Sequence, residues 1–176
     1  MSYVEIVILR RLFGGPAHGY ELRKRVEETT GFVLHNNSLY PALKRFEEAG
    51  AVTKTAERQE GRPSRLVYTL TEVGRDLLHD MIADLPPEAA ADDGEFMARL
   101  GQFSLIDPAE QAAVLAARAG AVQVRLAHVR KMQALAAEHG ERWGNLVAGE
   151  LIRRDEQELD WLAGLRELVA GLEGPA

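Results

Sequence analysis

The sequence predicts a mainly α-helical protein that also contains one small two-stranded β-hairpin. Apolar residues recur at helical spacing along most of the chain, two short segments around residue 61 have strand character, and only helical patterns occur after about residue 95. Between these parts, two consecutive prolines and an Ala-, Asp- and Gly-rich stretch, Pro86 to Gly94, indicate a boundary. We therefore expect one domain over residues 1–85 and a second, helical domain over residues 95–173.

Two short helices are expected at the start of the chain. The first ends at residues 14–16, a Gly-Gly-Pro sequence, because glycine is flexible and proline cannot continue a helix. The second covers residues 19–30 and ends at Gly31, a natural C-cap. Their apolar positions are Val4, Val7, Ile8 and Leu12 in the first helix and Tyr20, Leu22 and Val26 in the second.

The third helix is expected to begin near Asn37 or Ser38, because Pro41 is tolerated in a first helical turn, and to end at Gly50. One stripe of this helix is apolar, which predicts that it faces the core. The residues of this stripe are Leu39, Ala42, Leu43, Phe46 and Ala49.

A hairpin follows, with strands over residues 52–58 and 65–70 and a loop over residues 59–64. Alternation in the second strand predicts that Leu66, Tyr68 and Leu70 point inward. A fourth helix is expected from Thr71 to about Leu85. The apolar stripes together predict five large buried side chains: Tyr20, Leu39, Phe46, Tyr68 and Leu70.

The second half of the chain predicts a short amphipathic helix and then two long antiparallel helices. Asp107, Pro108 and Glu110 form the pattern of a capped helix start, and Gly140 ends the helix that begins there. The final helix runs from Trp143 to about Leu172. Its apolar residues recur at the spacing typical of a helix that packs lengthwise against another helix. We therefore expect a homodimer that forms through Ile152, Leu159, Leu162, Leu165 and Val169.

Charge is unevenly distributed along the chain. The formal net charge is −6, yet residues 1–80 carry +1 and residues 81–176 carry −7. A polyanionic partner is therefore expected at the first half. In that half, Lys44 and Arg45 lie in the third helix, and Arg58, Arg62 and Arg65 lie around the hairpin loop.

Several classes of function are disfavoured by the composition. The chain has no cysteine and no run of about 18 apolar residues, so we expect a cytoplasmic protein without disulfides or a membrane span. Its five histidines lack the short spacing of a metal site, and neither a phosphate loop nor a nucleophile elbow occurs. We expect no metal, no cofactor and no enzymatic activity.

Three helices, a hairpin and a fourth helix are the element order of a winged helix-turn-helix domain, which lays its third helix in the major groove of DNA and its loop against the backbone or minor groove. Lys44, Arg45 and Arg62 are the strongest candidate contacts, because this fold places all three on the DNA side. For these three residues, an ordinary solvent-exposed role without DNA is the open alternative. For Tyr40, packing in the core and contact with DNA are both open. The full set of expected DNA-binding residues is Asn37, Ser38, Tyr40, Lys44, Arg45, Arg58, Arg62, Ser64 and Arg65.

Three ordered motifs resemble the PadR family of transcriptional regulators. They are HGYEL at residues 18–22, SLYPALKRFEEAG at residues 38–50 and GRPSRLVYTLTEVG at residues 61–74. The resemblance implies a homodimer on palindromic double-stranded DNA, usually a repressor that a small molecule releases. Phe46 replaces the leucine that is more frequent in the family, and a single glycine precedes Arg62.

An apolar or aromatic effector is expected between the two halves, and the family resemblance motivates this more than the residues do. The two tryptophans could equally anchor a dimer or fill the core. A winged-helix module that binds protein instead of DNA is the alternative function, and a small-molecule binding protein or enzyme is a second. The expected effector residues are Phe96, Leu100, Phe103, Trp143 and Trp161.

Overall fold

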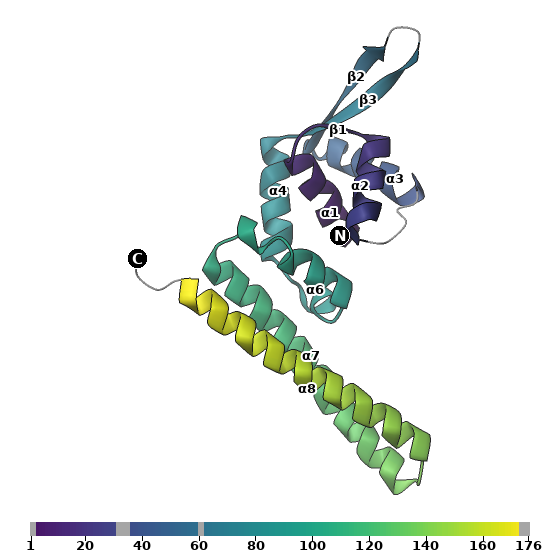
Figure 1. The fold of residues 1–176 in the computed structure, drawn as a ribbon, viewed down its shortest axis with the longest axis vertical. Coiled ribbons are helices and arrows are strands. Elements are labelled where there is room, and N and C mark those ends of the chain that lie inside the picture. The colour runs from purple at the N-terminus through teal and green to yellow at the C-terminus, as the bar shows by residue number, and fades with distance from the viewer. Residues whose placement is uncertain (1–2, 31–35, 60–61, 173–176) are drawn as a thin grey trace. The chain divides into compact units, whose positions relative to one another are not determined.

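The computed structural model describes residues 3–30, 36–59 and 62–172 (Figure 1). The chain divides into two compact units, Met1–Ile82 with Ala98–Gly101 and Ala83–Met97 with Gln102–Ala176. Each unit has its own core.

Three helices form the body of the first unit: α1 (Tyr3–Phe13), α2 (Gly19–Thr30) and α3 (Asn36–Glu48). All three were predicted, and α3 begins one residue earlier than expected. Gly31, the predicted end of α2, lies outside the described residues. The predicted core residues Leu39, Phe46, Tyr68 and Leu70 are buried, together with Ile8, Leu22 and Val26.

Some residues that the apolar stripes predicted to be buried are not. Tyr20 is 66% exposed, although its spacing to Leu22 and Val26 predicted burial. Ala49 is also exposed, and in α1 the fully covered stripe includes Glu5, Ile6 and Leu9, whereas Val4 and Val7 are only half-buried. The reason is that an apolar stripe is wider than the contact a short helix makes with its neighbours, so residues at its edges stay at the surface.

The sheet has three antiparallel strands in the order β1-β3-β2: β1 (Ala17–His18), β2 (Val52–Gln59) and β3 (Arg62–Leu70). The two-residue strand β1 was not predicted, because it is too short to show alternation. Arg62 pairs with Gln59, so both long strands extend into what was predicted to be a loop. Leu66, predicted to point inward, is largely exposed, because the hairpin extends beyond the helices that would cover it (Figure 1).

The helix α4 (Glu72–Ala83) begins at the predicted place. The Thr71 hydroxyl accepts a hydrogen bond from the backbone N–H of Gly74 and donates one to the carbonyl of Gly50, which joins the end of β3 to the turn after α3. Only glycine fits at position 74, because a Cβ atom there would clash with the carbonyl oxygen of Ala51 at 2.1 Å.

Short helical elements replace the flexible boundary predicted after residue 85. They are α5 (Pro87–Ala90), α6 (Asp93–Leu100) and the 3-10 turn Phe103–Leu105. The Asp92 carboxylate caps α6 by accepting a hydrogen bond from the N–H of Glu95. Proline in a first helical turn starts a helix as readily as it stops one, and composition alone could not separate these outcomes.

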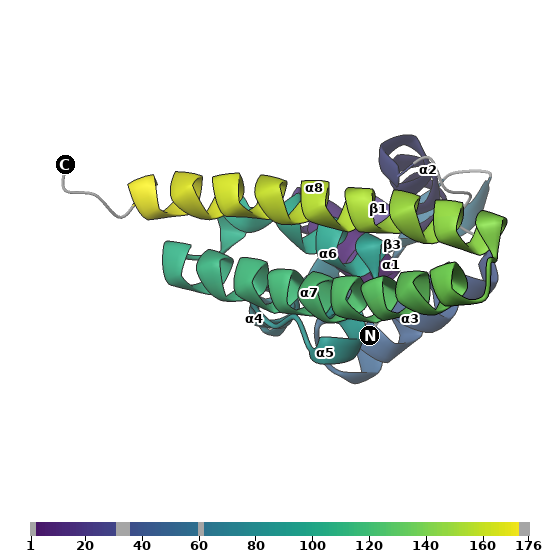
Figure 2. The same ribbon diagram turned by 90° about the horizontal axis from the view of Figure 1, so that it is seen from below.

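The second unit is dominated by α7 (Pro108–Glu138) and α8 (Arg142–Leu172), which lie side by side and antiparallel (Figure 2). Asp107 and Glu110 form the predicted capping box, and Gly140 has φ +68° in the turn between the two helices. Leu115, Val122 and Leu126 of α7 are buried.

Part of the apolar seam of α8 that was predicted to form a dimer packs within one chain, and its role in a dimer stays a prediction. Leu162 and Val169 are fully covered, and Ile152, Leu159 and Leu165 are half-buried. A heptad-like pattern shows that a helix packs lengthwise, but it does not show whether the partner belongs to the same chain.

Candidate nucleic-acid interface

The exposed face of α3 carries four of the residues predicted to contact DNA. Leu39, Leu43 and Phe46 anchor the helix in the core, which leaves Ser38, Tyr40, Pro41, Lys44, Arg45 and Glu48 exposed. A helix held by one apolar face and exposed along the opposite face has the geometry that fits a DNA groove.

The two cations of this face have different surroundings. The Lys44 side chain is 75% exposed and makes a 3.5 Å ion pair with Glu48, one turn further along. Arg45 donates a 2.5 Å hydrogen bond from Nη2 to Glu5 of α1, whose side chain is 7% exposed. Arg45 therefore also ties α3 to α1, which the sequence did not reveal because Glu5 is 40 residues away.

The hairpin β2–β3 is attached to α3 at its base. Lys54 Nζ donates a 2.7 Å hydrogen bond to Glu47 Oε2, and this hydrogen bond raises the pKa of Lys54. Further out, Arg65 is exposed and lies opposite Glu57 in the ladder. The structure brings Arg65 and Tyr40 together, since both line one open cavity.

Four predicted contacts cannot be placed at the level of side chains. Asn37 belongs to α3, Arg58 to β2, and Arg62 and Ser64 to β3, but their side chains lie outside the described residues. They remain predictions.

The five residues proposed for an effector do not form one group. Phe96 and Trp161 pack edge to face, with ring centroids 6.2 Å apart. Trp143 is 75% exposed and precedes Trp161 by five turns of α8, about 27 Å along the helix. Leu100 groups with the first unit, and Phe103 lies in the 3-10 turn of the second.

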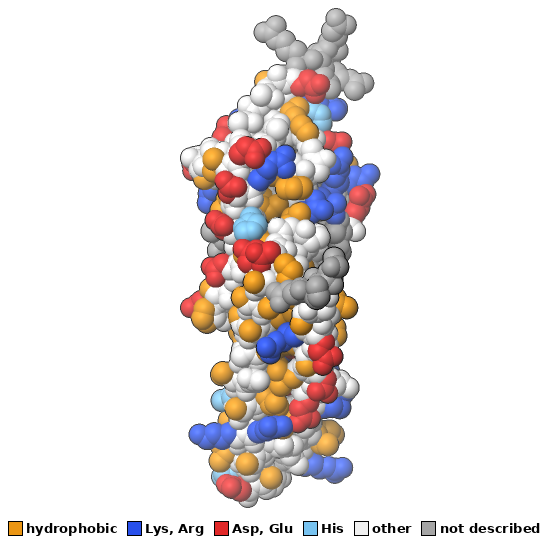
Figure 3. All heavy atoms as spheres, turned by 90° about the vertical axis from the view of Figure 1, so that its left-hand side faces the viewer, with side chains coloured by type: hydrophobic (Ala, Val, Ile, Leu, Met, Phe, Trp, Pro, Cys, Tyr) orange, Lys and Arg blue, Asp and Glu red, His pale blue; other side chains and the backbone are white. Residues whose placement is uncertain are grey.

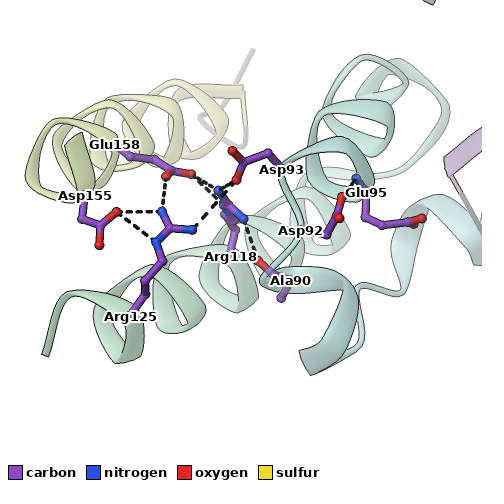
Figure 4. Close-up of polar contacts among 8 residues, drawn as sticks. All are labelled: Ala90, Asp92, Asp93, Glu95, Arg118, Arg125, Asp155 and Glu158. Atoms are coloured by element: carbon purple, nitrogen blue, oxygen red, sulfur yellow. Dashed lines mark hydrogen bonds and ion pairs between the residues drawn. The ribbon is translucent and has the colours of Figure 1, made fainter. Parts of the chain in front are cut away.

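A buried ionic cluster in the second unit was not predicted (Figure 4). Arg118 of α7 is 1% exposed, and its guanidinium donates hydrogen bonds to Glu158 Oε1 (2.7 Å), to the carbonyl of Ala90 (2.9 Å) and to Asp93. Its charge also lies over the ring of Phe96, 5.4 Å from the centroid.

Arg125 extends this cluster by one more pair. It donates to Asp155 and Glu158 of α8, and the hydrogen bond to Asp155 is the main cause of its raised pKa. Arg118 and Arg125 lie seven residues apart, two turns of one helix face. That spacing was the available signal, but arginine is usually assigned to the solvent face.

The described residues contain neither a metal-binding cluster nor a membrane-spanning helix. No group of three His, Cys, Asp or Glu side chains is arranged to hold a metal ion in the described part of the chain. In the same residues, no helix combines the length and the apolar run that a membrane span requires.

Comparison with known proteins identifies the first unit. Residues 8–80 match the family model described as the transcriptional regulator PadR-like family. A PadR family transcription regulator of hypervirulent Clostridium difficile R20291 is 34% identical, and the match covers 43% of this chain and 79% of that one, with a TM-score of 0.40.

Two curated relatives differ in how much of them the chain covers. The negative transcriptional regulator PadR of Bacillus subtilis (strain 168) is 22% identical over 96% of this chain and 98% of its own length. An uncharacterized 37.1 kDa protein in transposon Tn4556 of Streptomyces fradiae is 36% identical over 74 residues, and the chain spans only 20% of its length. The family match, the element order and the identity to the C. difficile regulator agree, and the chain belongs to the transcriptional regulator PadR-like family.

Proposed function

We propose that the protein is a sequence-specific DNA-binding transcriptional regulator without catalytic activity, which inserts α3 into the major groove and lays the β2–β3 hairpin along the backbone. The observation that carries this proposal is the exposed face of α3. Its exposed cation Lys44 and its polar Ser38 and Tyr40 lie on a helix anchored by core leucines, and Arg65 of the hairpin lines the same cavity as Tyr40. Phosphate contacts of this kind supply affinity, and side chains on the helix read the base edges.

The active form in this proposal is a homodimer on a palindromic operator, because two copies related by a two-fold axis read two half-sites. What supports a dimer is an apolar groove of about 490 Å³ between α7 and α8 near their connecting turn. In the space-filling view, hydrophobic side chains lie between charged ones along the helix pair α7 and α8 (Figure 3). The groove is lined by His128, Val129, Met132, Trp143, Gly144, Val147, Ala148 and Leu151.

The regulator is proposed to repress transcription. The B. subtilis relative is named a negative regulator, and a dimer bound across a promoter would exclude RNA polymerase. The alternative, a winged-helix module that binds protein, predicts no salt-dependent affinity for duplex DNA.

Selection of bound duplexes from a random DNA pool tests this proposal. The selected sequence should be a palindrome, and its affinity should fall as salt rises because counterions are released from the phosphates. Failure to retain any duplex above background at low salt would contradict DNA binding.

Alanine substitutions at Lys44 and Arg45 should both weaken binding to the selected duplex, but only the second should reduce stability. Lys44→Ala should lower the salt slope by about one per lost phosphate contact and leave the melting temperature unchanged. Arg45→Ala should also cost about 1–2 kcal/mol of folding free energy, because Glu5 loses a charged hydrogen-bond donor. Fluorescence anisotropy and thermal unfolding measure the two effects.

Arg75→Ala is the control for Lys44→Ala. Arg75 also pairs with a glutamate one turn away, Glu72, and 42% of its side chain is exposed, but it lies on α4, outside α2, α3 and the hairpin. An equal loss of affinity in both variants would show that only total charge matters and would contradict the assignment of α3.

A small aromatic or apolar effector that releases DNA is proposed to bind beside Phe96 and Trp161. What supports this place is that Trp161 packs edge-on against buried Phe96 and yet keeps 43% of its surface exposed, so a planar ligand can reach its ring. An effector with a 100-fold preference for the DNA-incompetent state would have about 2.7 kcal/mol with which to shift the equilibrium.

Two single-tryptophan variants test the effector proposal. In Trp143→Phe, which retains Trp161, a panel of planar aromatics should include a compound that quenches fluorescence saturably and releases DNA over the same concentration range. The reverse variant, Trp161→Phe, should show no saturable quenching. Quenching confined to Trp143, or quenching without release of DNA, would contradict this site.

A further inference from the structure

The first unit contains an open cavity of about 530 Å³ where the start of α2 meets α3 and β3. It includes residues that were not among the predicted DNA contacts, above all Tyr20 and His18. The cavity is lined by His18, Gly19, Tyr20, Glu21, Tyr40, Arg65, Leu66 and Tyr68.

Two tyrosines present their rings at this cavity. Tyr20 is 66% exposed, and the Arg23 guanidinium lies over its ring, 5.4 Å from the centroid. Tyr40 comes from α3 and packs against the first turn of α2, so closely that a Cβ atom at Gly19 would lie 3.2 Å from its hydroxyl oxygen. The ring of Tyr40 is therefore held in place by the backbone of α2, and Tyr20 is restrained by Arg23.

The polar groups of the cavity are mainly hydrogen-bond donors. The hydroxyls of Tyr20 and Tyr40 and the exposed guanidinium of Arg65 can donate to an anion, and the N-terminus of α2 adds a favourable field. Burial raises the pKa of Tyr68, so its hydroxyl also stays protonated at neutral pH. Leu66 and the two rings supply the apolar surface.

Two carboxylates limit the charge of an acceptable ligand. Glu21 lines the cavity and accepts a 3.3 Å hydrogen bond from the backbone N–H of His18. Glu57 lies 3.6 Å from Nε2 of the same histidine. They repel a dianionic free phosphate more strongly than a singly charged phosphodiester.

We propose that this cavity holds one phosphodiester group of the DNA backbone. The hydroxyls of Tyr20 and Tyr40 and the guanidinium of Arg65 surround the phosphate. The two tyrosine rings and Leu66 lie against the deoxyribose. This rests on the proposed function and extends the DNA surface from α3 to the start of α2. It assigns a role to Tyr20, whose exposure the apolar pattern of α2 does not explain. Phosphate contacts of this kind set the position of the recognition helix on the duplex.

Tyr20→Phe tests the contact, because it removes one hydroxyl and keeps the ring. Affinity for the selected duplex should fall about 3- to 10-fold per contact, with an unchanged salt slope because no charge is lost. The melting temperature should not move, since the hydroxyl belongs to an exposed side chain. Tyr3→Phe on α1, outside the cavity, is the matched control and should bind like the unmodified protein.

A methylphosphonate scan then identifies the phosphate. Single neutral replacements along the duplex should include one position per half-site that weakens the unmodified protein, and at that position Tyr20→Phe should cause no further loss. Strictly additive losses at every position would overturn the proposal, because they would show that Tyr20 contacts no phosphate.

The outcomes separate this proposal from the proposed function. If Lys44→Ala weakens binding and Tyr20→Phe does not, the phosphodiester site is wrong and the DNA-binding function stands. If the unmodified protein binds no duplex, both are wrong. If inorganic phosphate competes with DNA at constant ionic strength in the unmodified protein but not in Tyr20→Phe, the cavity is a free-anion site and this proposal is overturned.

Discussion

Leu151→Glu should convert the proposed dimer into monomers. Leu151 lines the groove between α7 and α8 with 41% of its surface exposed, so a glutamate there costs the single chain little but would be buried without a partner in a dimer. Light scattering should then give the 19.4 kDa mass of one chain. Binding to a palindromic duplex should fall by about 100-fold or more, because two linked half-site contacts become independent ones.

Leu168→Glu is the control for this prediction. Leu168 is an exposed leucine on the same helix, 17 residues or about 25 Å further along, outside the groove. It should leave the dimer and its DNA affinity intact. If Leu168→Glu dissociates the dimer and Leu151→Glu does not, the interface lies at the other end of α8.

Arg118→Ala should destabilise the helical unit more than any exposed arginine substitution. Arg118 joins α7 to α8 through Glu158 and to the turn between α5 and α6 through Ala90 and Asp93, so its loss removes three hydrogen bonds and leaves a cavity beside Phe96. Breaking such a buried ionic contact costs about 3–5 kcal/mol. For a chain of this length, the melting temperature should fall by about 6–20 °C in a circular-dichroism melt.

Arg130→Ala provides the comparison within the same helix. Arg130 makes a 2.7 Å ion pair with Glu156 across the same two helices, but both side chains are about half exposed. Such pairs contribute about 0–1 kcal/mol, so its melting temperature should hardly change. Arg118→Lys should recover little stability, because an ammonium cannot reproduce the three directions of the guanidinium hydrogen bonds. Equal melting temperatures for the two alanine variants would contradict a structural role for the cluster.

Much of the fold could be predicted because its signals are local. The capping box at Asp107, the Thr71 helix start and the glycine turn at residue 140 each depend on a few neighbouring residues, and all three occur where expected. The exposure of Ser38, Tyr40 and Lys44 on α3 follows the same reasoning, since helical periodicity separates a core face from an outer face.

Contacts between distant segments could not be predicted in the same way. Strand β1 is recognised only by its pairing with β3. The exposure of Tyr20 depends on how α3 and the hairpin pack against α2. The ion pair between Arg45 and Glu5 and the cluster around Arg118 each join residues 25 to 40 positions apart. Periodicity along one element carries no information on such partners.

By itself, the sequence determined the order and approximate bounds of the main helices and the two long strands, the family, and the outer face of α3. Those properties follow from backbone propensity, capping and the spacing of apolar residues, which act within a few turns of chain. The tertiary structure decided that Leu162 and Val169 pack within one chain, that Trp143 and Trp161 are too far apart to share a small ligand, and that Tyr20 faces a cavity instead of the core. The physical reason is that burial and ion pairing depend on which surfaces meet in space, and an apolar or charged side chain is compatible with several partners until the packed chain selects one.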